Sequence, residues 1–144
     1  MESTKEGATV VKQEDIKTGK FYQRGLGLER EVQGILKRDY YSNIVDHVRA
    51  HDYSLNAADL TIYLAKEFGF CYGVDRAVDY AYQAREKFPD RRIFLTGEII
   101  HNPHVNKRLI EMGIQFLSGQ YSNGMTTDEI RPEDVVILPA FGVS

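Results

Sequence analysis

The sequence contains a single cysteine, Cys71, and no tryptophan. One thiol cannot form an internal disulfide, which excludes a disulfide framework. No apolar run is long enough to span a bilayer. Residues Met1 to Lys20 lack an apolar signal core and carry four acidic residues, whereas transit peptides avoid acids. Together these absences predict a cytoplasmic protein with no membrane partner.

The sequence also lacks a large excess of positive or negative charge. The net charge is -3 over 144 residues and the pI is about 5.8. The nine tyrosines and seven phenylalanines are scattered and form no stacking platform, so a nucleic-acid partner is not expected. No Walker motif, paired metal-ligand spacing or serine elbow is present. The length and the 42% hydrophobic content fit one globular domain.

The second half of the chain alternates between strand and helix patterns. The apolar, β-branched run 60–64 predicts a buried strand, and helical spacing from Val74 predicts a helix that ends near Phe88-Pro89. A strand at 92–96, a helix from Pro103 to Gly113 and strands at 114–117 and 135–138 follow, with a loop at 118–134. This order predicts an α/β layer with a largely parallel sheet and flanking helices.

The first half has weaker patterns. Residues 1–20 are polar and expected to be mobile, and 21–27 should form an irregular ordered segment. Weak helical spacing covers 28–38. Ser42 is expected to cap a short helix to about residue 51, with Ile44, Val45 and Val48 on one face. We therefore expect an irregular and helical N-terminal extension over residues 1–58, followed by the α/β unit over 59–144.

Cys71 stands in a glycine-bracketed turn, Gly69-Phe70-Cys71-Tyr72-Gly73, between a predicted strand and a predicted helix. Backbone amides and the helix dipole at such a position favour a thiolate, the form that a metal or an iron–sulfur cluster requires. Glycines also allow a bulky ligand close to the backbone. The alternative is a small core residue in a tight turn, and position alone does not decide between the two.

His101 stands in the segment Gly97-Glu98-Ile99-Ile100-His101-Asn102-Pro103, before a helix start marked by a cap and a proline. An imidazole beside free helix amides can bind a diphosphate. The alternative is a histidine that is hydrogen-bonded to nearby backbone. Glu98 could act as an acid or base, but a solvated turn carboxylate is the favoured interpretation. His104 is expected to be structural or solvated.

A third turn, Pro139-Ala140-Phe141-Gly142, follows the last predicted strand. Turns after neighbouring parallel strands can converge on one ligand, although this one could also be an ordinary strand end. Lys107 and Arg108 are interpreted as a solvated helix face. The pair Arg91-Arg92 is interpreted as the flank of a strand.

These residues match the motifs of a known family. Residues 69–77, from Gly69 to Ala77, resemble the first cysteine motif of the LytB-type iron–sulfur reductases, and residues 98–103 resemble their first histidine motif at the matching spacing. Residues 135–142 resemble the segment that follows. Residues 22–27 and 40–56 resemble the N-terminal extension of the plant and cyanobacterial branch. The resemblance covers about residues 21–144.

The resemblance implies a fold of three α/β units around a 4Fe-4S cluster held by three cysteines, of which this chain resembles the first unit. It implies reductive dehydroxylation of 4-hydroxy-3-methylbut-2-enyl diphosphate to isopentenyl and dimethylallyl diphosphates, the last step of the non-mevalonate isoprenoid pathway. By the same resemblance, Cys71 is a cluster ligand, His101 binds the substrate's diphosphate, and ferredoxin or flavodoxin donates electrons.

Two departures limit this resemblance. Many bacterial members have a histidine where Phe141 stands, so one diphosphate contact does not carry over. The family's other two cluster cysteines and its proton relay would lie beyond Ser144, which leaves no catalytic residue to assign. We therefore expect a fragment that is inactive and binds no stoichiometric cluster alone, with exposed apolar surface at its last strand. The alternative function is a non-catalytic α/β phosphate-binding or interaction module.

Overall fold

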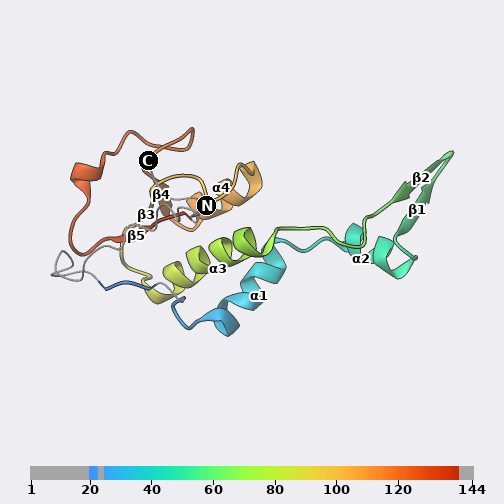
Figure 1. The fold of residues 1–144 in the computed structure, drawn as a ribbon, viewed down its shortest axis with the longest axis horizontal. Helices are drawn as coiled ribbons and strands as arrows, with labels where there is room; N and C mark the ends of the chain where they lie inside the picture. The colour runs from blue at the N-terminus through green and yellow to red at the C-terminus, as the bar shows by residue number, and fades with distance from the viewer. Residues whose placement is uncertain (1–19, 23–24, 140–144) are drawn as a thin grey trace, which may run out of the picture.

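The computed structural model describes residues 20–22 and 25–139, so the predictions for residues 1–19 and 140–144 lie outside the described chain. Two regions can be distinguished (Figure 1). We call residues 25–40 and 69–139 the body, and residues 41–68 the projection. The projection extends away from the body along the longest axis of the molecule.

The body is built on a three-stranded parallel sheet. Its central strand β3 (Ile93–Leu95) pairs with β4 (Ile114–Phe116) on one side and β5 (Val135–Ile137) on the other. The connection from β3 to β4 contains α4 (Pro103–Glu111), and the loop from β4 to β5 contains the short 3-10 helix η2 (Thr127–Glu129). The predicted α/β class, the parallel sheet and the weakly structured loop are confirmed.

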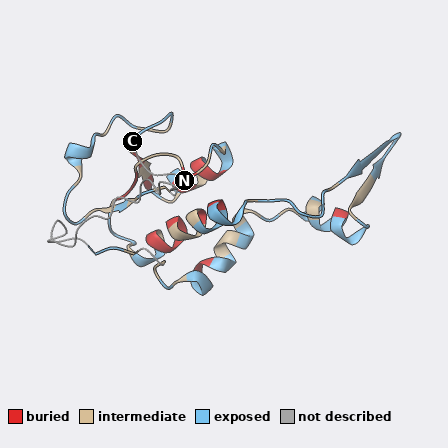
Figure 2. Ribbon diagram, viewed as in Figure 1, coloured by how far each residue is buried: buried red, intermediate tan, exposed pale blue. Residues whose placement is uncertain are grey.

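Two further helices complete the body. Helix α3 (Tyr72–Lys87) shares the hydrophobic core with the sheet and α4, and α1 (Glu29–Asp39) packs along α3. Burial is concentrated in these elements (Figure 2). The side chains that form this core are Val32, Val74, Val78, Ala81, Tyr82, Ala84, Ile93, Leu95, Ile99, Val105, Leu109, Ile114 and Phe116. No helix among the described residues is both long and apolar enough to cross a membrane.

The sequence explains where α3 begins, packs and ends. Its apolar residues Val74, Val78, Ala81 and Tyr82 recur at helical spacing and are all buried. Phe88 caps the helix, and a proline follows, which cannot continue it. The predicted helix and its end are therefore confirmed.

A buried glutamine fixes the chain at the entry to α1. The Gln83 side chain is fully buried, and its Oε1 accepts hydrogen bonds from the backbone amides of Leu26 at 3.0 Å and Leu28 at 3.2 Å. These two amides precede the helix and have no helical partner of their own. Gln83 thus links the segment before α1 to α3.

The projection contains α2 (Asn43–Ala50) and an antiparallel hairpin of β1 (Ser54–Ala57) and β2 (Leu60–Tyr63). The predicted cap is confirmed, because Ser42 Oγ accepts a hydrogen bond from the Val45 amide at 3.3 Å. No pattern in the sequence predicts β1.

The prediction that residues 60–64 form a buried strand of the parallel sheet is wrong. Strand β2 pairs with β1, and all four of its residues are exposed, including Leu60 at 68% and Ile62 at 51%. A β-branched apolar run favours an extended strand but does not specify what covers it. Ile44 is also 66% exposed, so the apolar face predicted for α2 is only partly buried.

Strand β5 forms where it was predicted, and its apolar residues are partly exposed. Val136 is 40% exposed and Leu138 is 59% exposed. The reason is its position, since β5 pairs with β3 on one side and is an edge of the sheet on the other. The exposed apolar surface expected at the last strand is therefore present.

Candidate functional site

Cys71 is the N-cap residue of α3, and its thiol is exposed and free. Its backbone is extended, with φ -66° and ψ 157°, and its side chain makes no capping hydrogen bond. A Cβ atom added to Gly69 or to Gly73 would meet no atom within 4 Å. The alternative interpretation of Cys71 as a buried core residue is therefore wrong, and the thiol faces open space at a helix start.

His101 lies in the turn between β3 and α4. Its side chain is 93% exposed, and its Nδ1 lies 3.2 Å from Glu98 Oε2. Asn102, the next residue, caps α4 by accepting hydrogen bonds from the amides of His104 and Val105. The alternative in which His101 is bonded to backbone is wrong, because its partner is a carboxylate.

Glu98 is not the solvated turn carboxylate that the sequence favoured. Its side chain is 8% exposed, and Oε2 accepts a hydrogen bond from Asn106 Nδ2 at 2.8 Å. Asn106 itself is fully buried on α4. The turn brings Glu98 back beneath the first turn of the helix, a placement that a sequence pattern does not reveal.

Tyr40, which ends α1, lies between the starts of α3 and α4. Its ring makes T-shaped contacts with Phe70 and with His104, each with ring centroids 5.8 Å apart. Phe70 precedes Cys71, and His104 follows His101 by three residues. One aromatic residue thus connects the two helix starts that carry the predicted site residues. Burial raises the pKa of Tyr40.

The prediction that Arg108 belongs to a solvated helix face is wrong. Its Nε donates to Asp39 Oδ2 at 2.7 Å, and the Tyr82 hydroxyl donates to the same oxygen at 2.8 Å. Burial would raise the pKa of Asp39, but the hydrogen bonds from Arg108 and Tyr82 outweigh it and lower that pKa. The side chains of Asp39, Tyr82 and Arg108 thus form a cluster that joins α1, α3 and α4. Lys107 is exposed, as predicted.

Arg92 directly precedes β3, as predicted, and also makes a specific contact. Its Nε donates to Asp134 Oδ1 at 2.8 Å, and the Asp134 side chain is 2% exposed. The hydrogen bond from Arg92 lowers the pKa of Asp134. The pair fixes the segment that enters β5 beside the central strand.

A groove of about 530 Å³ lies between α1 and α3. Its walls carry both signs of charge, from Glu29, Lys37, Asp75, Arg76 and Asp79. The two residues that flank Cys71 also line it, but neither Cys71 nor His101 does. Mixed charges do not select an anion, so the groove does not mark a diphosphate site.

Within residues 20–22 and 25–139, no group of three or more His, Cys, Asp or Glu side chains could hold a metal ion. Cys71 is the single cysteine of the chain, so it offers one thiolate. The third predicted turn begins at Pro139, and the rest of it, including Phe141, lies outside the described residues.

The body is an α/β unit in which helix starts present a thiol and a histidine, an arrangement typical of ligand-binding α/β proteins. The family model described as LytB protein matches residues 62–144, more than half of the chain. The chain therefore belongs to the LytB protein family. The match begins within β2, so α1, α2 and β1 precede it.

Curated relatives extend the similarity toward the N-terminus. Each is named 4-hydroxy-3-methylbut-2-enyl diphosphate reductase. The protein of Acaryochloris marina is 44% identical over 128 residues, which is 89% of this chain and 31% of the relative. That of Thermosynechococcus vestitus is 46% identical over 125 residues, 86% of this chain and 31% of the relative. That of Gloeobacter violaceus is 44% identical over 127 residues, which is 86% of this chain and 30% of the relative.

The chain thus spans about 31% of the length of the curated relatives it matches. The matched part includes more residues than the family model covers, so part of the N-terminal half is shared with these cyanobacterial proteins. No solved structure matches the chain.

Proposed function

We propose that this chain acts as the first α/β unit of an iron–sulfur reductase that converts 4-hydroxy-3-methylbut-2-enyl diphosphate to isopentenyl and dimethylallyl diphosphates, the last step of the non-mevalonate pathway. The observation that carries the proposal is the pairing of two helix starts around Tyr40, one with Cys71 and one with His101. Membership of the LytB family supports it.

In this proposal Cys71 supplies one of three thiolates for a 4Fe-4S cluster. Three features of the structure fit such a ligand: the thiol is exposed, it sits at a helix N-terminus, and the glycines beside it leave room for a bulky group. When bound, the cluster supplies electrons and a Lewis-acidic iron for the substrate's alcohol oxygen. The other two thiolates would come from the remainder of a longer protein.

His101 is the proposed diphosphate ligand. Its ring is exposed, and it stands directly before the capped N-terminus of α4, where the helix dipole favours an anion. Ferredoxin or flavodoxin is the proposed electron donor, and the cytoplasm the proposed compartment. The proposed boundary between the N-terminal extension and the α/β unit, between residues 58 and 59, falls in the turn that joins β1 to β2.

The proposal can be tested with a chimera. This chain would replace the segment that it matches in the Thermosynechococcus vestitus relative, and anaerobically purified protein would be assayed for iron content and substrate reduction. We expect an active chimera, loss of both iron and activity in Cys71→Ser, and retained iron with a raised KM in His101→Asn. A soluble chimera in which Cys71→Ser keeps its iron and its activity would contradict the proposal.

A further inference from the structure

Glu98 has an environment that a surface turn does not require. Its carboxylate is enclosed on two sides, by Asn106 of α4 and by the loop after β4. A Cβ atom added to Gly119 in that loop would lie 3.2 Å from Glu98 Oε1, and Gly119 has a φ of +84°. The loop therefore approaches Glu98 closely at a residue whose backbone favours glycine.

Asn106 fixes the orientation of this carboxylate. Its Nδ2 donates to Glu98 Oε2 at 2.8 Å and to the Ile100 carbonyl at 3.1 Å. Because Asn106 is fully buried, both bonds form away from competing water. A buried carboxylate also needs partners, since a buried charge without them is costly. Among the described residues, the side chains of Asn106 and His101 lie within hydrogen-bond distance of Glu98 Oε2.

The chemistry of this contact sets the state of the His101 ring. An ionised carboxylate only accepts hydrogen bonds, so the ring nitrogen that faces Glu98, Nδ1, must carry the hydrogen. The other nitrogen, Nε2, then belongs to the part of the side chain that is 93% exposed. When Nε2 also carries a hydrogen, Glu98 compensates the positive charge of the ring.

We propose that Glu98, oriented by Asn106, is a positioning residue: it accepts a hydrogen bond from His101 Nδ1–H, so that Nε2, once it also carries a hydrogen, donates to the diphosphate. Carboxylates behind metal-bound histidines fix the tautomer and the ring orientation in the same way. The inference rests on the proposed role of His101 as the diphosphate ligand. It adds that Glu98 acts through His101 rather than by touching the substrate.

The first test is the tautomer itself, measured on the 144-residue chain by NMR with ¹⁵N-labelled histidine. The His101 signals are assigned by their loss in His101→Asn. We expect the Nδ1–H form in the wild-type chain and a shift toward the Nε2–H form in Glu98→Met, which removes both acceptor oxygens at similar size. The matched control is Glu86→Met, which removes an exposed carboxylate on α3 and should leave the His101 signals unchanged. A wild-type ring in the Nε2–H form would overturn the proposal.

The second test titrates the same samples with inorganic diphosphate while the His101 signals are followed. We expect saturable shifts in the wild-type chain, and about tenfold weaker binding in Glu98→Met because the oriented ring is lost. Equal affinity in Glu98→Met and the wild type would overturn the positioning role. If the wild-type chain binds no diphosphate while the tautomer still depends on Glu98, the diphosphate role of His101 fails instead.

A folding control keeps both tests decisive. If circular dichroism shows that Glu98→Met is unfolded, Asn106→Ser takes its place. That variant keeps the carboxylate but removes the side-chain amide that orients it. We expect a partial shift of the tautomer toward Nε2–H, and an unchanged tautomer would overturn the role given to Asn106 and Glu98.

Discussion

Leu109 on α4 and Leu60 on β2 are both leucines in regular secondary structure, yet the first is fully buried and the second is 68% exposed. The difference holds for the two regions as a whole. In the body, several elements converge on one core, whereas in the projection Val48 is the buried hydrophobic residue. The projection instead leaves Tyr41, Ile44, Leu60, Ile62, Tyr63 and Phe68 exposed.

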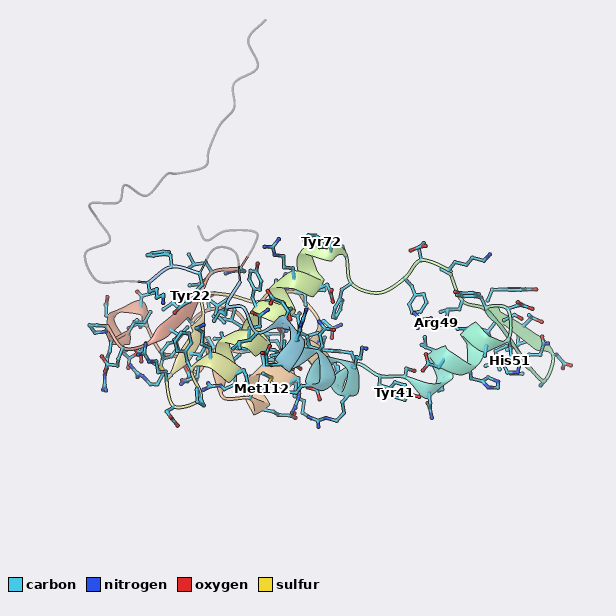
Figure 3. The ribbon with its side chains drawn as sticks, turned by 90° about the horizontal axis from the view of Figure 1, so that it is seen from below. Tyr22, Tyr41, Arg49, His51, Tyr72 and Met112 are labelled. Atoms are coloured by element: carbon cyan, nitrogen blue, oxygen red, sulfur yellow. The ribbon has the colours of Figure 1, made fainter. Side chains whose placement is uncertain are left out.

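The contacts that hold the projection together are correspondingly local. Arg49 lies over the Phe68 ring at 4.8 Å, and the Tyr53 amide donates to the Val48 carbonyl at 2.9 Å. Figure 3 shows Tyr41, Arg49 and His51 along the projection, and Tyr72 where the chain re-enters the body at α3. A two-stranded hairpin alone is marginally stable in water. Apolar content therefore does not measure the stability of a region, because stability depends on how much apolar surface is buried.

The largest expected effect comes from the two leucines. Leu109→Ala should lower the free energy of unfolding by about 3 kcal/mol, because it removes buried methyl groups and leaves a cavity. Leu60→Ala makes the same chemical change on an exposed strand and should change it by less than about 0.5 kcal/mol. Urea denaturation followed by circular dichroism measures both. Similar losses in the two variants would show that the projection is packed in solution.

A smaller effect is expected from the cluster that joins α1, α3 and α4. Asp39→Asn should cost about 2 kcal/mol at neutral pH, because it weakens the hydrogen bonds from Arg108 and Tyr82 to a charged acceptor. The pKa of Asp39 is lowered in the folded chain, so between the folded and unfolded values the unfolded chain binds more protons. The contribution of Asp39 to the free energy of unfolding is therefore present above about pH 4 and is lost as the pH falls below that value.

The control for this pH dependence is Asp79, whose pKa is raised by burial. Its contribution has the opposite sign, since it favours folding at low pH and is lost as the pH rises through its folded value. The free energy of unfolding, measured from acidic to neutral pH, should therefore rise less steeply with pH in Asp39→Asn than in the wild type. In Asp79→Asn it should rise more steeply. Parallel curves for all three chains would contradict these assignments.

The smallest effects compare one cap in each region. Asn102→Ala removes the cap of α4 and should lower global stability by about 1 kcal/mol. Ser42→Ala removes the cap of α2 in the projection, where fraying is local and should leave the urea midpoint nearly unchanged. Hydrogen exchange would detect that fraying as faster exchange in α2. A lower midpoint in Ser42→Ala would show that the projection unfolds together with the body.

The same contrast explains what the sequence could predict. Local signals were sufficient for the caps Ser42 and Asn102, for the end of α3 at Phe88 and for the parallel order of the central strands, because each depends on neighbouring residues or on chain order. The exposure of β2 could not be predicted. It depends on which elements lie against a strand, and an apolar pattern is the same whether or not a partner is present.

For the candidate site, the motifs identified Cys71 and His101 but not the residues packed around them. Tyr40 contacts Phe70 and His104 from a distant part of the sequence, and Glu98 contacts His101 across a turn. The one available signal was the spacing of three residues between Glu98 and His101 ahead of a capped helix. It is too short a pattern to distinguish a buried carboxylate from a solvated one.

The central claim is that Cys71 and His101 belong to one site at the paired starts of α3 and α4. Because Cys71 is the single cysteine and is exposed, a nitroxide spin label can be attached to the wild-type chain without any substitution. Paramagnetic broadening of NMR signals then reports which residues lie near it. We expect strong broadening of His101 and His104 and little broadening of Asn56 on the hairpin of the projection. Sharp signals from His101 and His104 would contradict it.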